Sequence, residues 1–167
     1  MVPVMKGKLK QAGFTITEMM ITMAIIGVLM AIAVPSLLRS RLGSNEEAMK
    51  LDLRAFGTGN EAFRAARTPT PAYAANINEL QGIPNPPAFI DASWGTAAGK
   101  HGFLQVYAGG GGATPNSYSL RVSPLTPNVT AVNTYCIDQN GIILGSVNGA
   151  GAPVGDPAGC VGGVAIP

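Results

Sequence analysis

The fold of this chain is decided by residues 10–40, which read KQAGFTITEMMITMAIIGVLMAIAVPSLLRS. Between Met19 and Leu38 there is no Asp, Glu, Lys or Arg. Twenty such residues are enough to cross a bilayer as a helix. Glu18 stands at the head of this run, where an isolated carboxylate in lipid costs about 2.5 kcal/mol or more. A costly residue in such a place is a candidate for a function.

The composition indicates one modest domain joined to an extended apolar element. The chain has 167 residues, of which 12% are charged, whereas roughly a quarter is usual in soluble domains. The low fraction of charged residues is due in part to the apolar run, which contains none. Residues 68–167 are rich in Gly, Pro, Ser, Thr and Asn, which predicts a loop-heavy domain that contains strands.

Charge is distributed unevenly along the chain. Lys6, Lys8 and Lys10 precede Phe14, and without residues 1–13 the formal net charge falls from +2 to −1. Basic residues before the apolar run place residues 1–13 in the cytoplasm and the C-terminal domain outside it. The slightly acidic C-terminal domain lacks the basic surface of a nucleic-acid binder, so we expect no specific nucleic-acid site. Translation could start at Met1 or at Met5.

The helical pattern continues beyond Arg39 but becomes amphipathic. Apolar residues recur near heptad spacing, while charged residues occupy the other face. We expect one helix from Phe14 to about Arg67, ended by the prolines of Thr68-Pro69-Thr70-Pro71. Its apolar first half then requires lipid or further copies of itself. The apolar stripe of the second half comprises Leu42, Met49, Leu53, Phe56, Asn60 and Phe63.

The C-terminal domain has the pattern of a small antiparallel sheet. We expect strands at 103–107, 117–123, 134–138 and 142–147, with a hairpin at Asn140-Gly141 and a short helix at 76–80. Cys136 and Cys160 are predicted to form a disulfide, as an even pair does in a translocated domain. The bridge is worth about 3 kcal/mol on the chain-entropy view. Residues 148–167 are expected to form an irregular segment that this bridge holds in place.

No catalytic set is visible, so we expect a protein that is not an enzyme and has no cofactor. His101 is the lone histidine and is interpreted as a solvated loop residue. Asp138 and Asp156 are interpreted as turn residues, with a calcium site as the alternative. We therefore predict no metal ligands.

The basic leader, the Gly13-Phe14 junction and Glu18, with Gly27 and Pro35 in the apolar run, resemble the N-terminal signature of type IV pilins and type II secretion pseudopilins. The resemblance covers about residues 6–45. It implies cleavage between Gly13 and Phe14 by a prepilin peptidase that also methylates the new terminus at Phe14. It also implies an α+β pilin fold, in which a long N-terminal helix packs against a small antiparallel sheet.

The same resemblance gives the domains and partners. Residues 1–13 are a cleaved leader, 14–38 the transmembrane and filament-core half of the helix, 39–67 its amphipathic half, and 68–167 a globular head. The precursor would sit in the inner membrane with its N-terminus in the cytoplasm. An assembly ATPase and an inner-membrane platform would then move it into a helical homo-oligomeric filament. Gly27 and Pro35 are the positions where the packed helix is expected to loosen.

Glu18 has a physical part in such assembly. The ammonium group of an incoming Phe14 can pair with the carboxylate of a neighbour, which removes two uncompensated charges together. A buried ion pair is weak evidence for stability, but it favours one register over a slipped one. The alternative is a carboxylate that lies at the lipid interface without a role.

Three functions remain open at this point. The first is a subunit of a type IV pilus for adhesion, motility or DNA uptake, either major or minor. The second is a pseudopilin of a type II secretion system, found in a periplasmic pseudopilus. The third is a soluble secreted domain behind an ordinary signal peptide, cut after Ala31-Ile32-Ala33 so that Val34 becomes the first residue.

Overall fold

A computed structural model of the chain describes residues 13–84, 86–96, 99–109, 116–147 and 151–166. The chain divides into two compact units between Arg39 and Ser40. One helix, α1 (Ile16–Ala66), contributes residues to both units. Its 51 residues agree with the predicted span of 14 to about 67, and the helix continues through Gly27 and Pro35.

In the first unit, every residue from Gly13 to Arg39 is exposed. The large apolar side chains here are not covered by any described part of the chain; Phe14 is 76% exposed and Ile32 is 74% exposed. A segment that is apolar all round and buries nothing does not gain stability from the rest of its own chain. This apolar surface can be removed from water only by lipid or by other protein molecules.

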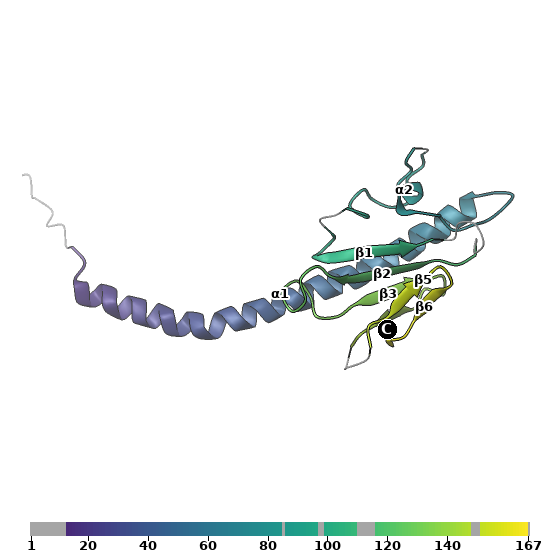
Figure 1. The fold of residues 1–167 in the computed structure, drawn as a ribbon. Coiled ribbons are helices and arrows are strands. Elements are labelled where there is room, and N and C mark those ends of the chain that lie inside the picture. Colours follow the sequence, from purple (N-terminus) through teal and green to yellow (C-terminus); the bar gives the residue numbers. More distant parts are fainter. Residues whose placement is uncertain (1–12, 85, 97–98, 110–115, 148–150, 167) are drawn as a thin grey trace, which may run out of the picture. The chain divides into compact units, whose positions relative to one another are not determined.

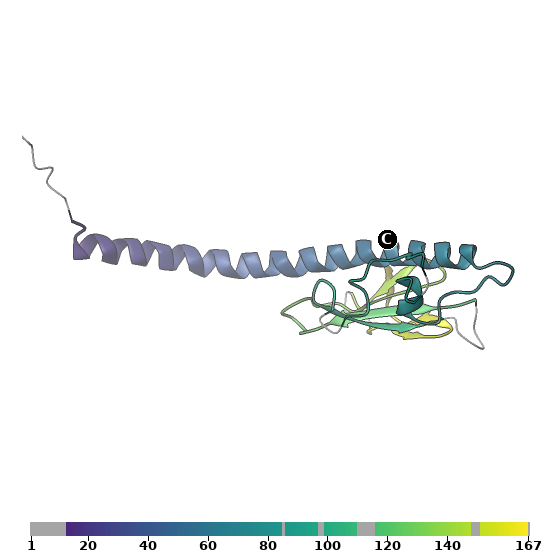
Figure 2. The same ribbon diagram turned by 90° about the horizontal axis from the view of Figure 1, so that it is seen from above.

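The second unit is built on an antiparallel sheet of five strands in the order β1-β2-β3-β4-β7. Figure 1 shows β1, β2 and β3 side by side along the C-terminal part of α1, and Figure 2 shows the sheet on one side of that part of the helix. The short helix α2 (Ile77–Leu80), capped by the side chain of Asn76, precedes the sheet. The strands are β1 (Phe103–Ala108), β2 (Ser119–Pro124), β3 (Tyr135–Asp138), β4 (Ile143–Gly145) and β7 (Val164–Ile166).

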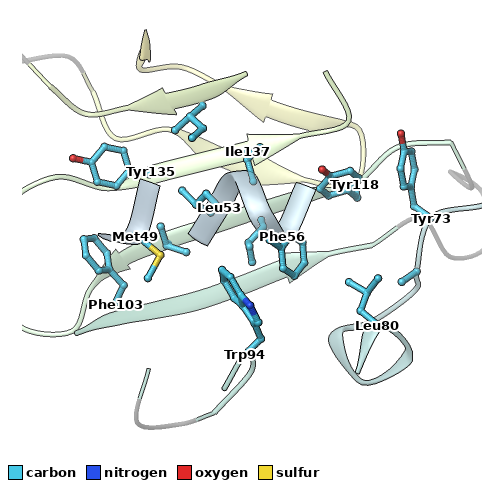
Figure 3. Close-up of a cluster of buried hydrophobic side chains, with 14 of the residues drawn as sticks. Met49, Leu53, Phe56, Tyr73, Leu80, Trp94, Phe103, Tyr118, Tyr135 and Ile137 are labelled. Carbon is cyan, nitrogen blue, oxygen red and sulfur yellow. The ribbon is translucent and has the colours of Figure 1, made fainter. Parts of the chain in front are cut away.

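The core lies between α1 and one face of this sheet. Every third or fourth residue of α1 from Met49 to Phe63 is buried, which is the predicted stripe, and Leu42 is half-buried at its start. Figure 3 shows Met49, Leu53 and Phe56 directed at the side chains of the strands. Alternation along the strands brings one apolar row to this face. The row is Tyr107, Leu120, Ile137, Ile143 and Ile166, which pair across neighbouring strands.

Two glycines of α1 lie in the contact with the head. Glycine lowers helix propensity, but Gly57 and Gly59 are both buried. A Cβ atom on Gly59 would lie 2.8 Å from Ile90 Cγ2 and 2.8 Å from the carbonyl oxygen of Phe89. Gly59 therefore allows the loop after α2 to approach the helix backbone closely.

The prediction of an irregular segment at 148–167 is wrong for its described part. Three short strands occur there: β5 (Val154–Asp156), β6 (Gly159–Val161) and β7. β5 and β6 form a hairpin, and β7 adds to the sheet beside β4. The pattern was hidden because these strands have only three residues each, and β5 and β6 contain glycine, so tertiary pairing rather than local propensity forms them.

The hairpin covers the face of the sheet that points away from α1. Ser119 Oγ donates a 2.7 Å hydrogen bond to the carbonyl oxygen of Asp156, and Ser119 is fully buried. The predicted disulfide joins Cys136 on β3 to Cys160 on β6. The α+β layout of a long helix packed on a small antiparallel sheet is thus confirmed, with one more sheet strand than expected and a second, two-stranded sheet.

Candidate processing and assembly site

The start of α1 is organised by Thr15 and Glu18. The backbone N–H of Glu18 donates to Thr15 Oγ1 at 3.2 Å, and the Thr15 hydroxyl lies 3.5 Å from Glu18 Oε2. The backbone N–H of Met19 donates to the Thr15 carbonyl at 3.2 Å. Thr15 is therefore the N-cap, and Glu18 occupies the third helical position, with its side chain against the Thr15 hydroxyl. A carboxylate in the first turn also interacts favourably with the helix dipole.

Glu18 is exposed and lies in an apolar surface. Phe14, Ile16, Met19, Met20 and Met23 line a shallow apolar concavity at this end of the helix. Gly13 precedes the helix, is exposed, and has open space around the position of a Cβ atom. The peptide bond between Gly13 and Phe14 thus lies in non-helical, accessible chain, next to a first turn that presents one acidic group.

Among the described residues, one helix is long and apolar enough to cross a membrane by length and composition. This is α1, whose most apolar window has a mean hydropathy of 2.4 and no buried residues. A soluble protein's core helix would have most of such a window buried. The exposed window is therefore a surface that requires an external apolar partner.

A second polar centre connects α1 to the head through Glu46. Its carboxylate accepts hydrogen bonds from the backbone N–H groups of Val132 (2.8 Å) and Asn133 (3.0 Å), from the Asn133 side chain and from the Tyr135 hydroxyl. Burial alone would raise the pKa of Glu46, but these four donors outweigh it and hold the pKa below its ordinary value. Beside it, Asn45 Nδ2 donates to the Thr130 carbonyl at 2.9 Å.

Comparison with known proteins concerns the start of α1, around Thr15 and Glu18. Residues 8–34 match the family described as "Prokaryotic N-terminal methylation motif". The chain is 39% identical to the type IV major pilin protein PilA of Myxococcus xanthus over 71 residues. These findings support a type IV pilin family. The match covers 42% of this chain and 31% of that relative, so the chain spans about a third of the relative's length. No solved structure matches the chain.

The two predicted turn carboxylates, Asp138 and Asp156, accept hydrogen bonds in turns. Asp138, which is buried, accepts hydrogen bonds from the backbone N–H groups of Asn140 (2.9 Å) and Cys160 (3.2 Å). Asp156 accepts from the N–H groups of Ala158 and Gly159. Within the described ranges no group of three or more His, Cys, Asp or Glu side chains could hold a metal ion.

The sequence also carries a signal that predicts the N-cap of α1. Thr15 and Glu18 have the capping-box spacing, which the sequence shows directly. His101 is exposed as predicted, but its Nε2 lies 2.9 Å from Asp52 Oδ2 of α1. Lys100 also contacts Asp52 and lies over the Trp94 ring. No local signal reveals such contacts, because Asp52 is far away in sequence.

Proposed function

We propose that this chain is the precursor of a structural subunit of a type IV pilus. The prepilin is inserted in the inner membrane, cleaved after Gly13, N-methylated on Phe14 and assembled through its apolar helix. The observation that carries the proposal is the exposed apolar segment from Phe14 to Leu38, with one acidic residue near its start. In the membrane its partner is lipid, and in the filament its partners are the same segments of neighbouring subunits.

The mechanism is assembly rather than catalysis. Cleavage would convert the Phe14 nitrogen from an amide to an ammonium, four residues before Glu18. In the lipid, both charges are costly. In a helical array the Phe14 ammonium of one subunit pairs with Glu18 of a neighbour, and the pair exists only in one stagger of the two helices. The membrane peptidase, the assembly ATPase and the inner-membrane platform are proposed as partners on the basis of the family resemblance.

The N-terminal residue of the mature protein tests the processing step. We expect mass spectrometry of protein from cells with the peptidase to give N-methyl-Phe14 as the first residue. Cells without the peptidase should retain the lysine-bearing leader. A mature chain that begins at Val34 would instead indicate an ordinary signal peptide and would contradict the proposal.

Substitution of Glu18 tests the assembly step. We expect Glu18→Ala to be inserted and cleaved normally but to yield few or no filaments, because the ion pair that fixes the register is lost. Thr17→Ala is the matched control, since it changes the neighbouring polar residue and leaves both charges in place. Electron microscopy of sheared surface filaments is the measurement. Normal filaments in Glu18→Ala cells would exclude the proposed role of this residue.

The pseudopilin function is the second candidate from the sequence. The similarity to a protein described as a type IV major pilin supports the pilus. Deletion of the gene separates the two functions. Loss of long surface filaments with normal protein secretion supports a pilus subunit, whereas loss of secretion without loss of filaments supports a pseudopilin.

A further inference from the structure

The β2–β3 loop, residues 125–134, presents apolar side chains to solvent. Leu125 is 45% exposed, Val129 is 70% exposed and Val132 is 55% exposed. No charged residue occurs between Arg121 and Asp138. Single exposed apolar residues are ordinary on protein surfaces, but this loop exposes three within eight uncharged residues, and we refer to it as the apolar tip.

The backbone of this tip is almost fully hydrogen-bonded within the protein. Pro127 has no N–H, and every other N–H group of residues 125–133 except that of Ala131 has an acceptor among the described contacts. Such satisfaction matters because an unpaired backbone group is costly wherever water is excluded. The acceptors are the Gly102 carbonyl for Leu125, Thr130 Oγ1 for Thr126, the Ala131 carbonyl for Asn128, the Thr126 carbonyl for Val129 and Thr130, and Glu46 for Val132 and Asn133.

The loop is attached to α1 close to the end of the apolar segment. Its anchors are Asn45 and Glu46 through the hydrogen bonds described above. Asn45 follows Arg39 by six residues, which is roughly 9 Å of helix axis at 1.5 Å per residue. Arg39 and Arg41 are exposed and fall between the apolar segment and the anchors. Arginines at the end of a membrane helix extend their heads to the interface.

We propose that the β2–β3 loop is a second membrane contact of the inserted precursor, with Leu125, Val129 and Val132 seated in the interfacial layer of the outer leaflet. The inference rests on the proposed function, in which residues 14–38 cross the inner membrane. The loop has the three properties that the interface requires: apolar side chains, no charged residue of its own, and a backbone whose donors are almost all used. Its anchors, Asn45 and Glu46, follow Arg39 by six and seven residues along the chain.

A second copy of the chain is the other possible occupant of this surface. The lipid interface is favoured because the loop is attached next to the segment that is itself apolar and exposed. Contact with another copy requires only a complementary surface and does not depend on anchors that follow the apolar segment so closely in sequence.

Fluorescence quenching in reconstituted vesicles tests the inference with the full chain. The sequence has two cysteines, which form the disulfide, so Val129→Cys introduces one free thiol for an environment-sensitive dye. The matched control is Ile142→Cys, because Ile142 is also apolar and is 51% exposed, but lies in the β3–β4 turn. Ile25→Cys reports on the apolar segment itself. Lipids that carry a spin label near the headgroup or deep in the acyl chain serve as quenchers.

We expect the dye at residue 129 to shift to shorter wavelength and to be quenched by the shallow spin label, with no quenching at residue 142. Quenching at 25 but not at 129 overturns the inference and leaves the proposed function intact. No quenching at 25 refutes the membrane insertion on which both depend. A shift at 129 that grows with the protein-to-lipid ratio, without quenching by lipid, assigns the surface to a second copy and also overturns the inference. Circular dichroism of each labelled variant confirms that the head is folded.

Discussion

Glu46 is the residue on which the junction of helix and head depends. One carboxylate satisfies two backbone N–H groups of a loop that lies more than eighty residues away in sequence, as well as two side chains. Hydrogen bonds to a charged group are each worth about 1.5–3 kcal/mol. Loss of the charge therefore weakens several contacts together, in contrast to the loss of an ordinary surface carboxylate.

We predict that Glu46→Gln lowers the unfolding free energy at neutral pH by about 1–3 kcal/mol. The pKa of Glu46 is lower in the folded chain than its ordinary value, so the carboxylate stabilises the fold above the unfolded pKa near 4.3. This contribution is lost as the pH falls through the lower, folded pKa. The difference between wild type and variant should therefore shrink toward pH 3. Urea unfolding of the detergent-solubilised chain at both pH values measures it.

The neighbouring glutamate gives the matched control for this prediction. Glu47 is 71% exposed in its side chain and pairs with Lys50 on the helix surface. Glu47→Gln should change the unfolding free energy by well under 1 kcal/mol. Equal effects of the two substitutions would show that the loop contacts of Glu46 do not contribute.

Alanine substitutions at two glycines of α1 are expected to change stability in opposite directions. Gly59→Ala is predicted to destabilise the head, because the new methyl group would lie 2.8 Å from both Ile90 and the Phe89 carbonyl. Gly43→Ala meets nothing within 4 Å and should stabilise by up to about 1 kcal/mol through helix propensity. Thermal unfolding monitored by circular dichroism measures both. Stabilisation by Gly59→Ala would contradict the close approach described here.

At the scale of elements, the disulfide connects the β5–β6 hairpin to β3. The bridged cysteines are 24 residues apart, so the chain-entropy estimate is about 3.5 kcal/mol. We predict that the double variant Cys136→Ser/Cys160→Ser loses close to this much stability. The loss of protection should be concentrated in β5 and β6, because the strands of the main sheet keep their ladder and their core.

Hydrogen exchange followed by mass spectrometry checks the location of that loss. Peptides from residues 151–161 are expected to exchange much faster in the variant, and peptides from β2 to change little. A uniform change over all strands would show that the bridge stabilises the whole head rather than the hairpin.

Prediction from sequence succeeded where the spacing of apolar residues clearly matched either a helix or a strand. The stripe from Met49 to Phe63 and the alternation around Leu120 are strong local patterns, and both elements occur where expected. It failed for β5, β6 and β7, because strands of three residues give no clear alternation and pair only where other segments hold them. At the candidate site, the apolar run and Glu18 were evident in the sequence, whereas the Glu46 contacts depend on residues brought together by the fold.

For the whole molecule, the described core lies entirely after Arg39. No residue from Gly13 to Arg39 is buried, and the buried apolar cluster begins at Met49. We predict that a fragment starting at Ser40 folds with a melting temperature close to that of the full chain. It should stay monomeric without detergent in analytical ultracentrifugation, because the exposed apolar segment has been removed. Aggregation of this fragment would show that residues 13–39 also shield part of the head.

The place of β7 in the sheet has a consequence for biogenesis. In the proposed topology, with the leader held in the cytoplasm, β4 reaches the far side of the membrane before β7, and the edge of β4 stays unpaired in the interval. An unpaired strand edge is a template for pairing with another nascent polypeptide. Once β7 has been translocated it pairs with β4, and the exposed edge is covered. Truncated chains that lack β7 would keep the β4 edge unpaired and should aggregate more readily.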